Sequence, residues 1–306
     1  MTTSNDHKKA KKSGNRESER PWEDLLNRSP ELLDIVLERA VELAGSMWET
    51  FNDPDLQRRL EYLPRNNLNE FGYDSFGYSP DYITKVLPLA ALLHRFYFRG
   101  QTYGIDNVPS TGRVMLVANH SGQLPFDGFM IGSSMLLDAD PPRPVRSMVE
   151  RWVPTLPFAS VFLSRCGQVV GTPENCRKLL EDDECVLVFP EGSRGISKTF
   201  DKRYQLQKFG YGFMRLAIET GTPIVPVGVV GAEEQAPSIY NWEGMAKILG
   251  APAVPITPLM AILGPLGILP MPVKYHIHFG EPMTFGGNPN DDEGTIGRHV
   301  KQVKTA

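Results

Sequence analysis

Apolar residues recur at three- and four-residue intervals between positions 29 and 51, which predicts an amphipathic helix there. The preceding triplet Ser29-Pro30-Glu31 is typical of a helix start: the serine caps, the proline suits the first helical position and the glutamate complements the dipole. Acidic residues share this helix, so we expect it to cover a core rather than enter lipid. Its apolar stripe consists of Leu33, Leu37, Ala40, Ala44, Met47, Trp48 and Phe51.

The next two segments have opposite character. Residues 52–82 are rich in Asn, Asp, Pro, Gly and Tyr, which predicts an irregular connector. Residues 83–98 are strongly apolar, but the run is too short to span a bilayer and contains Pro88. It ends in aromatic residues mixed with arginines, a composition that suits a membrane–water interface as well as a buried helix. Both interpretations stay open.

From Gly104 onward, continuous apolar runs alternate with helical patterns. The runs at 114–118, 185–189 and 224–230 predict strands buried on both faces. Helical patterns follow at 127–137 and 210–219. This alternation predicts an α/β fold with a layered mixed sheet flanked by helices, preceded by an N-terminal helical extension.

Two further segments follow the predicted core strands. Residues 251–273 carry no charge and are long enough to span a bilayer, but six prolines interrupt them, so a monotopic hydrophobic loop or an acyl-chain lining is favoured over a Pro-rich core crossover. Residues 273–279 alternate apolar and polar positions, which predicts a half-buried strand. His276 and His278 share its polar face; with no third ligand nearby in sequence, a polar strand face is preferred to a metal site.

Composition and charge narrow the class of protein. The chain has 306 residues, 41% hydrophobic and 22% charged, which is enough for a sizeable core. Its formal net charge of -4 disfavours a nucleic-acid partner. Three cysteines without a C-x-x-C spacing predict buried thiols rather than disulfides or a zinc knuckle. Residues 1–20 are polar, lysine-containing and free of a secretory signal.

These patterns divide the chain into four expected parts. Residues 1–28 form a disordered polar tail and residues 29–99 a helical N-terminal region. Residues 100–285 form the α/β domain, and residues 286–306 a polar C-terminal tail.

The first candidate site is the segment Asn119 to Asp127, which directly follows a predicted buried strand. That junction is where α/β sheets bind ligands. His120 can accept a proton from a hydroxyl, and the Asp127 carboxylate, bonded to the other ring nitrogen, would fix the tautomer and stabilise the imidazolium. Taken alone, the same residues are compatible with a loop histidine and a helix-capping aspartate.

Two further blocks offer cationic groups. Phe189 to Gly195 (FPEGSRG) also follows a buried strand; its Arg194 offers a forked donor for phosphate, and its glycines can expose backbone N–H groups. Phe162 to Arg165 (FLSR) supplies a second arginine, and two arginines together could grip a phosphomonoester. A fourth block, Ile224 to Gly228, is an apolar strand that we expect to shape the wall of the site.

The order of these four blocks resembles the glycerol-phosphate acyltransferase superfamily, which includes the 1-acylglycerol-3-phosphate acyltransferases. The resemblance covers residues 95–285, and FPEGSRG is its most specific block. It implies acyl transfer from acyl-CoA or acyl-carrier protein to a glycerolipid hydroxyl, in phospholipid or lipid metabolism, with no metal or cofactor. It also implies that the protein partners membrane lipid at the cytoplasmic face, as a peripheral or monotopic protein.

The resemblance also assigns roles to individual residues. His120 matches the catalytic histidine and Asp127 its supporting aspartate, while Arg165, Glu191, Gly192, Ser193 and Arg194 match the acceptor-binding blocks. Here six residues separate the histidine from the aspartate, where the family pattern has four, so the loop must bulge. Relatives that use neutral lipid acceptors carry a similar Gly- and Pro-containing loop.

Several alternatives remain open at this stage. The acceptor is phosphorylated, such as lysophosphatidate, or neutral, such as a mono- or diacylglycerol. A serine hydrolase is disfavoured because the chain has no G-x-S-x-G elbow. A non-catalytic membrane-lipid binding protein would use the apolar segments without needing His120.

Overall fold

The computed structural model describes residues 38, 42, 44–50, 53–65, 67–155, 159–249 and 253–306. The chain divides into two units, residues 1–49 and 50–306. In the first unit, residues 44–49 are helical, as the stripe predicts, while Leu33, Leu37 and Ala40 lie outside the described residues, as does the expected polar tail. The second unit contains the sheet and the candidate site.

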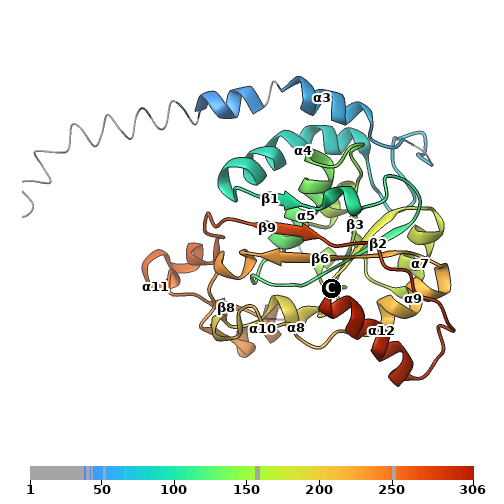
Figure 1. Cartoon of the computed structure of the whole chain (residues 1–306). Helices are drawn as coiled ribbons and strands as arrows, with labels where there is room; N and C mark the ends of the chain where they lie inside the picture. Colours follow the sequence, from blue (N-terminus) through green and yellow to red (C-terminus); the bar gives the residue numbers. More distant parts are fainter. Residues whose placement is uncertain are drawn as a thin grey trace, which may run out of the picture. The chain divides into compact units, whose positions relative to one another are not determined.

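A seven-stranded mixed sheet organises the second unit (Figure 1). Its strand order is β1-β9-β6-β2-β5-β3-β4, and every neighbouring pair is parallel except β6 with β9. A separate ribbon pairs β7 with β8. The strands are β1 (Gln101–Tyr103), β2 (Val114–Ala118), β3 (Arg146–Val149), β4 (Val169–Val170), β5 (Cys185–Val188), β6 (Ile224–Val230), β7 (Tyr240–Asn241), β8 (Pro255–Ile256) and β9 (His276–Phe279).

The helices lie mainly between the strands in sequence, as the alternation predicts. The α-helices are α3 (Pro54–Glu61), α4 (Pro80–Leu92), α5 (Phe126–Leu137), α6 (Ala159–Arg165), α7 (Pro173–Glu181), α8 (Ser193–Ile196), α9 (Gly212–Thr220), α10 (Glu243–Leu249), α11 (Met260–Leu263) and α12 (Glu293–Thr305). A π-helical turn, η1 (Leu93–Tyr97), extends α4. The 3₁₀ turns are η2 (Ile105–Asn107), η3 (Val153–Thr155), η4 (Phe200–Lys202), η5 (Ala232–Glu234) and η6 (Gly264–Ile268).

The two faces of the sheet bury separate cores, which follows from the two-residue period of a strand. On β2, Leu116 belongs to the cluster that includes Met130 and Ile131 of α5. Its neighbour Met115 belongs to the cluster that holds the apolar faces of α7, α9 and α12. The architecture is therefore helices, sheet and helices in three layers, and the α/β fold class predicted from the sequence is confirmed.

The segment expected to be an irregular connector contains helix α3, so that expectation is wrong for residues 54–61. Asp53 caps the helix by accepting a hydrogen bond from Asp55 N at 2.9 Å, and Pro54 occupies its first turn. Leu56 and Leu60, four residues apart, are buried against α4 and α5. The surrounding turn-forming residues conceal this short apolar stripe in the sequence.

Residues 83–98 form most of α4 and η1, and their apolar side chains divide between buried and exposed positions. Ile83, Leu87 and Ala91 are buried in the cluster shared with α3. Leu89 and Tyr97, in contrast, are 55% and 38% exposed. Among the described residues, no helix is both long and apolar enough to cross a bilayer.

The C-terminal segment differs from the polar tail expected over 286–306. Residues 293–305 form α12, which Asp292 caps through hydrogen bonds from the backbone N–H groups of Gly294 and Thr295. Ile296, Val300 and Val303 are buried against the sheet-facing cluster of α7 and α9. Polar residues dominate the composition of this segment, but its few apolar residues share one helical face.

Candidate active site

His120 and the FPEGSRG block meet at the carboxyl edge of the sheet. Strands β2 and β5 are parallel neighbours, with Val117 paired to Val188. The segments that follow these strands therefore leave the sheet side by side. As predicted, the first brings His120 and the second brings Glu191 to the edge where α/β sheets bind ligands.

The imidazole of His120 and the carboxylate of Asp127 lie 2.7 Å apart, between Nδ1 and Oδ2. Asp127 is fully buried; its Oδ2 also accepts from Ser121 N at 2.9 Å, and its Oδ1 accepts from Gly128 N at 2.8 Å. A carboxylate that already accepts from two backbone donors requires the imidazole to donate its Nδ1–H. Nε2 is then the basic nitrogen, and no hydrogen bond within the described residues occupies it.

The six-residue loop between these two residues is bent by two left-handed positions. Gly122 has φ of +90° and Gln123 has φ of +64°. A Cβ at position 122 would lie 2.3 Å from the carbonyl oxygen of Ala232, so only glycine fits there. The expected bulge is therefore present, and it brings the aspartate to the histidine despite the longer spacing.

The side chain of Gln235 anchors this loop through hydrogen bonds. This residue was not identified from the sequence. Its fully buried amide donates from Nε2 to the carbonyl oxygens of Gly122 and Leu124, at 2.8 and 2.9 Å. Its Oε1 accepts from the Tyr275 hydroxyl at 2.7 Å. These partners are 40 to 113 residues away, so no local sequence pattern could reveal them.

Contacts with β6 and with Phe189, the residue after β5, fix the position of the histidine. The Asn119 side chain bonds both backbone groups of Val229 in β6, donating at 2.9 Å and accepting at 2.7 Å. The imidazole stacks on the Phe189 ring with centroids 4.1 Å apart, and 12% of the His120 side chain stays exposed. The block Ile224–Gly228 belongs to β6, the strand next to β2, and its role in the wall of the site stays a prediction.

The Glu191 carboxylate is buried and bonded to two backbone donors. It is 1% exposed; Oε1 accepts from His120 N at 2.9 Å, and Oε2 accepts from Gln207 N at 2.5 Å. Each oxygen thus accepts from a backbone donor, so the glutamate holds the histidine loop in place, and its predicted contact with an acceptor stays a prediction. Gly192 follows with φ of 58° and ψ of −149°, a conformation almost confined to glycine.

The two arginines do not converge. Arg194 lies exposed on α8, and its guanidinium donates to the carbonyl oxygen of Lys208 at 3.2 Å. Arg165 ends α6, where its guanidinium lies 3.4 Å from the centroid of the Tyr73 ring and donates to Gly77 O. Two residues after Arg165, the carbonyl oxygen of Gly167 accepts a hydrogen bond from Arg146 Nε, at the start of β3. Arg165 is therefore near the amino edge of the sheet, opposite His120, and the expected arginine pair is not formed.

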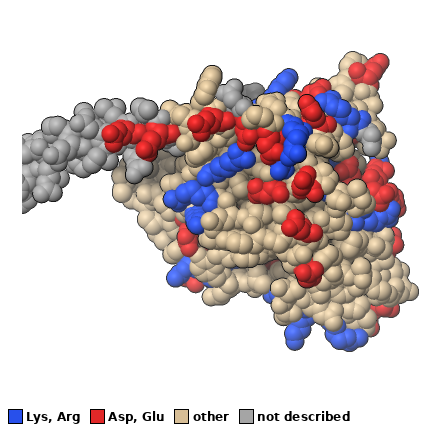
Figure 2. All heavy atoms as spheres, turned by 45° about the horizontal axis from the view of Figure 1, so that its top comes forward, with Lys and Arg blue, Asp and Glu red and all other residues tan. Residues whose placement is uncertain are grey.

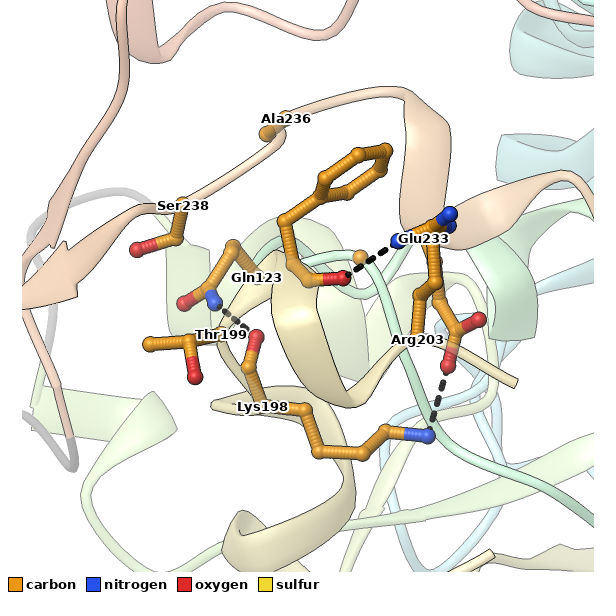
Figure 3. Close-up of a pocket in the computed structure, with 9 residues that line it drawn as sticks. Gln123, Lys198, Thr199, Arg203, Glu233, Ala236 and Ser238 are labelled. Carbon is orange, nitrogen blue, oxygen red and sulfur yellow. Dashed lines mark hydrogen bonds and ion pairs between the residues drawn. The ribbon is translucent and has the colours of Figure 1, made fainter. Parts of the chain in front are cut away.

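A pocket opens beside the histidine loop, and Gly122 and Gln123 are among the residues that line it (Figure 3). The Gln123 side chain donates to Lys198 O at 2.6 Å, and the nearly buried Lys198 ammonium pairs with Glu233 at 2.6 Å. Ser193 lies at the start of α8, and its carbonyl accepts from the Ser197 hydroxyl. The histidine loop is thus tied to the 193–208 segment by side-chain and backbone bonds.

The three cysteines outside this site are free thiols, and the two histidines of β9 stack on an aromatic ring. The pKa values of Cys166, Cys176 and Cys185 are raised by burial, to about 12, 11 and 12, so the thiols stay protonated. His276 and His278 stack on the Tyr103 ring, with centroids 6.1 and 4.4 Å away. In the described ranges, no group of three or more His, Cys, Asp or Glu side chains is arranged to hold a metal.

The chain is similar in sequence to several known proteins. The acyltransferase family model matches residues 99–230. An uncharacterised protein of Mycobacterium leprae is 34% identical over 249 residues, which cover 78% of this chain and 68% of the relative. An uncharacterised protein of Mycobacterium tuberculosis (strain H37Rv) is 35% identical over 72% of this chain and 63% of its own length. The chain thus spans about two thirds of these relatives.

Two more distant proteins are also similar. The human "DGAT1/2-independent enzyme synthesizing storage lipids" is 22% identical over 71% of this chain and 61% of its own length. Among solved structures, the 1-acyl-sn-glycerophosphate acyltransferase PlsC of Thermotoga maritima aligns with a TM-score of 0.47 and 16% identity, over 73% of this chain and 77% of that one.

Proposed function

Because the chain belongs to the acyltransferase family, we propose that it moves a fatty acyl group from acyl-CoA or acyl-carrier protein to the hydroxyl of a glycerolipid. The observation that carries this proposal is the 2.7 Å bond between His120 Nδ1 and the buried Asp127 carboxylate. It leaves Nε2 as a base at the carboxyl edge of the sheet. We further propose that the protein works as a peripheral or monotopic protein on the cytoplasmic face of a membrane, where its lipid acceptor resides.

The proposed reaction is direct acyl transfer with His120 as general base. Nε2 takes the proton of the acceptor hydroxyl as that oxygen attacks the thioester carbonyl. The tetrahedral intermediate collapses with cleavage of the carbon–sulfur bond, and the imidazolium returns its proton to the leaving thiolate. Asp127 stabilises the imidazolium, and backbone N–H groups of the Gly122 turn or the FPEGSRG block are candidate donors to the oxyanion.

Thiol release from one acyl-CoA, measured with and without a lipid acceptor, tests this proposal. We expect release that depends on the acceptor and that His120→Ala nearly abolishes, since general base catalysis contributes roughly 10²–10⁴-fold. Full activity of that variant would exclude the mechanism. Acceptor-independent release, or none with any acceptor, would instead favour hydrolysis or a non-catalytic lipid-binding role.

The acceptor is proposed to be lysophosphatidate or a neutral glycerolipid, and one observation favours the neutral class. A phosphomonoester needs converging cations, whereas Arg165 lies near the opposite edge of the sheet from His120. The human relative named for storage-lipid synthesis points the same way. A panel of glycerol 3-phosphate, lysophosphatidate, monoacylglycerol, diacylglycerol and an amino-lipid decides between the classes. A preference for lysophosphatidate, weakened by Arg194→Ala, would reject the neutral acceptor.

A further inference from the structure

The segment 253–272 forms a folded apolar surface, here named the apolar platform. It contains α11 and η6, which contact each other extensively. Its outward side chains are unusually exposed for their type: Ile262 81%, Leu263 52%, Leu266 65% and Leu269 58%. Large aliphatic side chains exposed together mark an interaction surface, whereas single ones are ordinary.

The platform has an internal structure that holds these side chains outward. Thr257, 2% exposed, donates its hydroxyl proton to Gly267 O at 2.7 Å. Gly267 is buried, and a Cβ there would lie 2.3 Å from Met260 N, so the two turns are in close contact. The apolar side chains are therefore displayed by a compact unit in which backbone polar groups bond internally, which is the condition for contact with lipid.

Residues from the N-terminal part of the second unit extend this surface. The Tyr97 hydroxyl donates to Pro270 O and the Arg99 guanidinium to Pro272 O, both at 2.6 Å. Tyr97 is itself 38% exposed. The aromatic and basic end of η1 thus lies against the platform, although 173 residues separate the bonded pairs. Aromatic and arginine side chains beside an aliphatic surface are typical of the membrane–water interface.

The stretch of chain between Glu243 and Glu281, which contains the platform, carries only basic charged residues. Between Glu243 and Glu281 the chain contains no acidic residue, and the lysines in this stretch, Lys247 and Lys274, flank the platform. Figure 2 shows acidic and basic side chains gathered over the α3 side of the molecule, whereas the lower part of that face is mainly uncharged. A surface with an aliphatic centre and a basic margin complements anionic lipid headgroups over acyl chains.

The platform is also connected to the candidate active site. Met271 N donates to the backbone oxygen of Gln235 at 2.7 Å, and the side chain of the same glutamine holds the carbonyl groups of Gly122 and Leu124. In Figure 1, α11 lies at the end of the sheet to which β6 points, and β6 is parallel to β2. The platform and His120 therefore share the carboxyl edge.

We propose that the apolar platform docks on an anionic lipid bilayer, with Ile262 and Leu266 inserted among the acyl chains and Lys247 and Lys274 at the headgroups. This inference rests on the proposed function, in which the acceptor is a membrane lipid. A second copy of this chain is a poorer occupant, because a two-fold contact would set the basic margin against itself. Docking at this edge brings the histidine loop to the lipid surface.

Vesicle sedimentation with the full chain, in the absence of acyl donor, tests the platform. Vesicles contain phosphatidylcholine alone or phosphatidylcholine with phosphatidylglycerol. We expect the double variant Ile262→Ser/Leu266→Ser to weaken binding to both by roughly tenfold or more, since two buried aliphatic contacts are lost. Phe71→Ser, a change at a 73% exposed aromatic residue of the same unit, is the matched control and should bind like the wild type.

The charge-reversal variant Lys247→Glu/Lys274→Glu separates the electrostatic contribution to vesicle binding from the apolar contribution. It should lose binding to the phosphatidylglycerol vesicles and keep most of its binding to phosphatidylcholine. Circular dichroism and the thermal midpoint of each variant, unchanged from the wild type, exclude misfolding. The proposal would be overturned if the serine variant bound vesicles as tightly as the wild type. It would also be overturned if the wild type formed a concentration-dependent dimer that the serine variant does not form. Sedimentation measures binding and does not depend on turnover. A protein that binds the vesicles but shows no acyltransferase activity in a separate assay would reject the proposed function and leave this inference standing.

Discussion

The carboxylate of Glu191 accepts a hydrogen bond from the backbone N–H of His120 at 2.9 Å, so the FPEGSRG block supports the candidate base directly. The other oxygen of the same carboxylate accepts from Gln207 N. One buried side chain therefore joins the segment after β2, the segment after β5 and the chain leading to α9. A motif that resembles an acceptor-binding element in sequence thus also contacts the backbone of the histidine.

Glu191→Gln tests this positioning role. The glutamine can accept from only one of the two backbone donors, and its amide group then faces the other N–H, leaving a buried donor without a partner. We expect the stability to fall by ~1–3 kcal/mol and kcat by about one to two orders of magnitude with little change in the acceptor KM. Urea unfolding and steady-state kinetics measure these effects.

Glu150→Gln is the matched control, because Glu150 lies exposed next to Gly192 at the same edge of the sheet. It should leave both stability and kcat close to wild-type values. An acceptor KM that rises in Glu191→Gln while kcat stays constant would return the glutamate to an acceptor-binding role.

Asp127→Asn should change the tautomer of His120 while keeping the loop folded. With the asparagine oxygen in the place of Oδ1, it still accepts from Gly128 N, and the amide group in the place of Oδ2 faces Nδ1 and forces that nitrogen to be the acceptor. The proton moves to Nε2, which loses its basicity toward the acceptor hydroxyl. We expect kcat to fall by about 10⁴-fold. A variant with normal circular dichroism and near-normal kcat would show that the pair does not act as a base.

Gly195→Ala tests how closely α8 must approach the histidine. A Cβ at this position would lie 2.7 Å from Glu191 Cβ, 2.9 Å from His120 O and 3.0 Å from His120 Cβ. The histidine must shift by several tenths of an ångström, and a misplacement of about 1 Å costs roughly 10²-fold in rate. Gly212→Ala in α9 meets nothing within 4 Å and should leave kcat unchanged. Equal activity of the two variants would mean that the histidine position is not critical.

Local patterns in the sequence predict the sheet and the His120–Asp127 pair well. The apolar runs of β2, β5 and β6 predict buried strands, because a strand covered on both faces does not alternate between polar and apolar residues. The bend of the six-residue loop can also be predicted locally. A histidine after a strand and an aspartate at a helix start can meet only if the loop turns back, and Gly122 permits that turn.

Long-range contacts explain what the sequence does not reveal. Gln235 and Asn119 look like ordinary loop residues, and only the packing of β6 and the 231–238 turn brings them to the histidine loop. The direction of Arg165 is likewise set by the aromatic ring of Tyr73, a partner that lies 92 positions earlier (165 − 73). Helix α3 was missed for another reason, because two leucines in eight residues are too few to show a period.

Arg165 should contribute to stability rather than to acceptor binding. Its guanidinium lies over the Tyr73 ring and donates to Gly77 O, so it fastens residues 67–79 to α6. We expect Arg165→Ala to lower the free energy of unfolding by ~1 kcal/mol without changing the KM of any acceptor. Arg194→Ala, at the exposed α8 position, is the comparison and should leave stability unchanged. A selective rise in the lysophosphatidate KM for Arg165→Ala would contradict this assignment.

The buried His94 should make stability depend on pH. Burial lowers its pKa below the ordinary 6.5, outweighing the attraction of Asp138, and its Nε2 lies 3.0 Å from Ser134 Oγ. As the pH falls below about 6.5, the unfolded chain takes up a proton at this histidine before the folded chain does, so stability declines toward the lower folded pKa. Wild type should therefore lose more stability between pH 7.5 and 5.5, in urea unfolding, than His94→Gln, whose side chain does not titrate. Equal pH slopes for the two proteins would show that His94 is not the residue responsible.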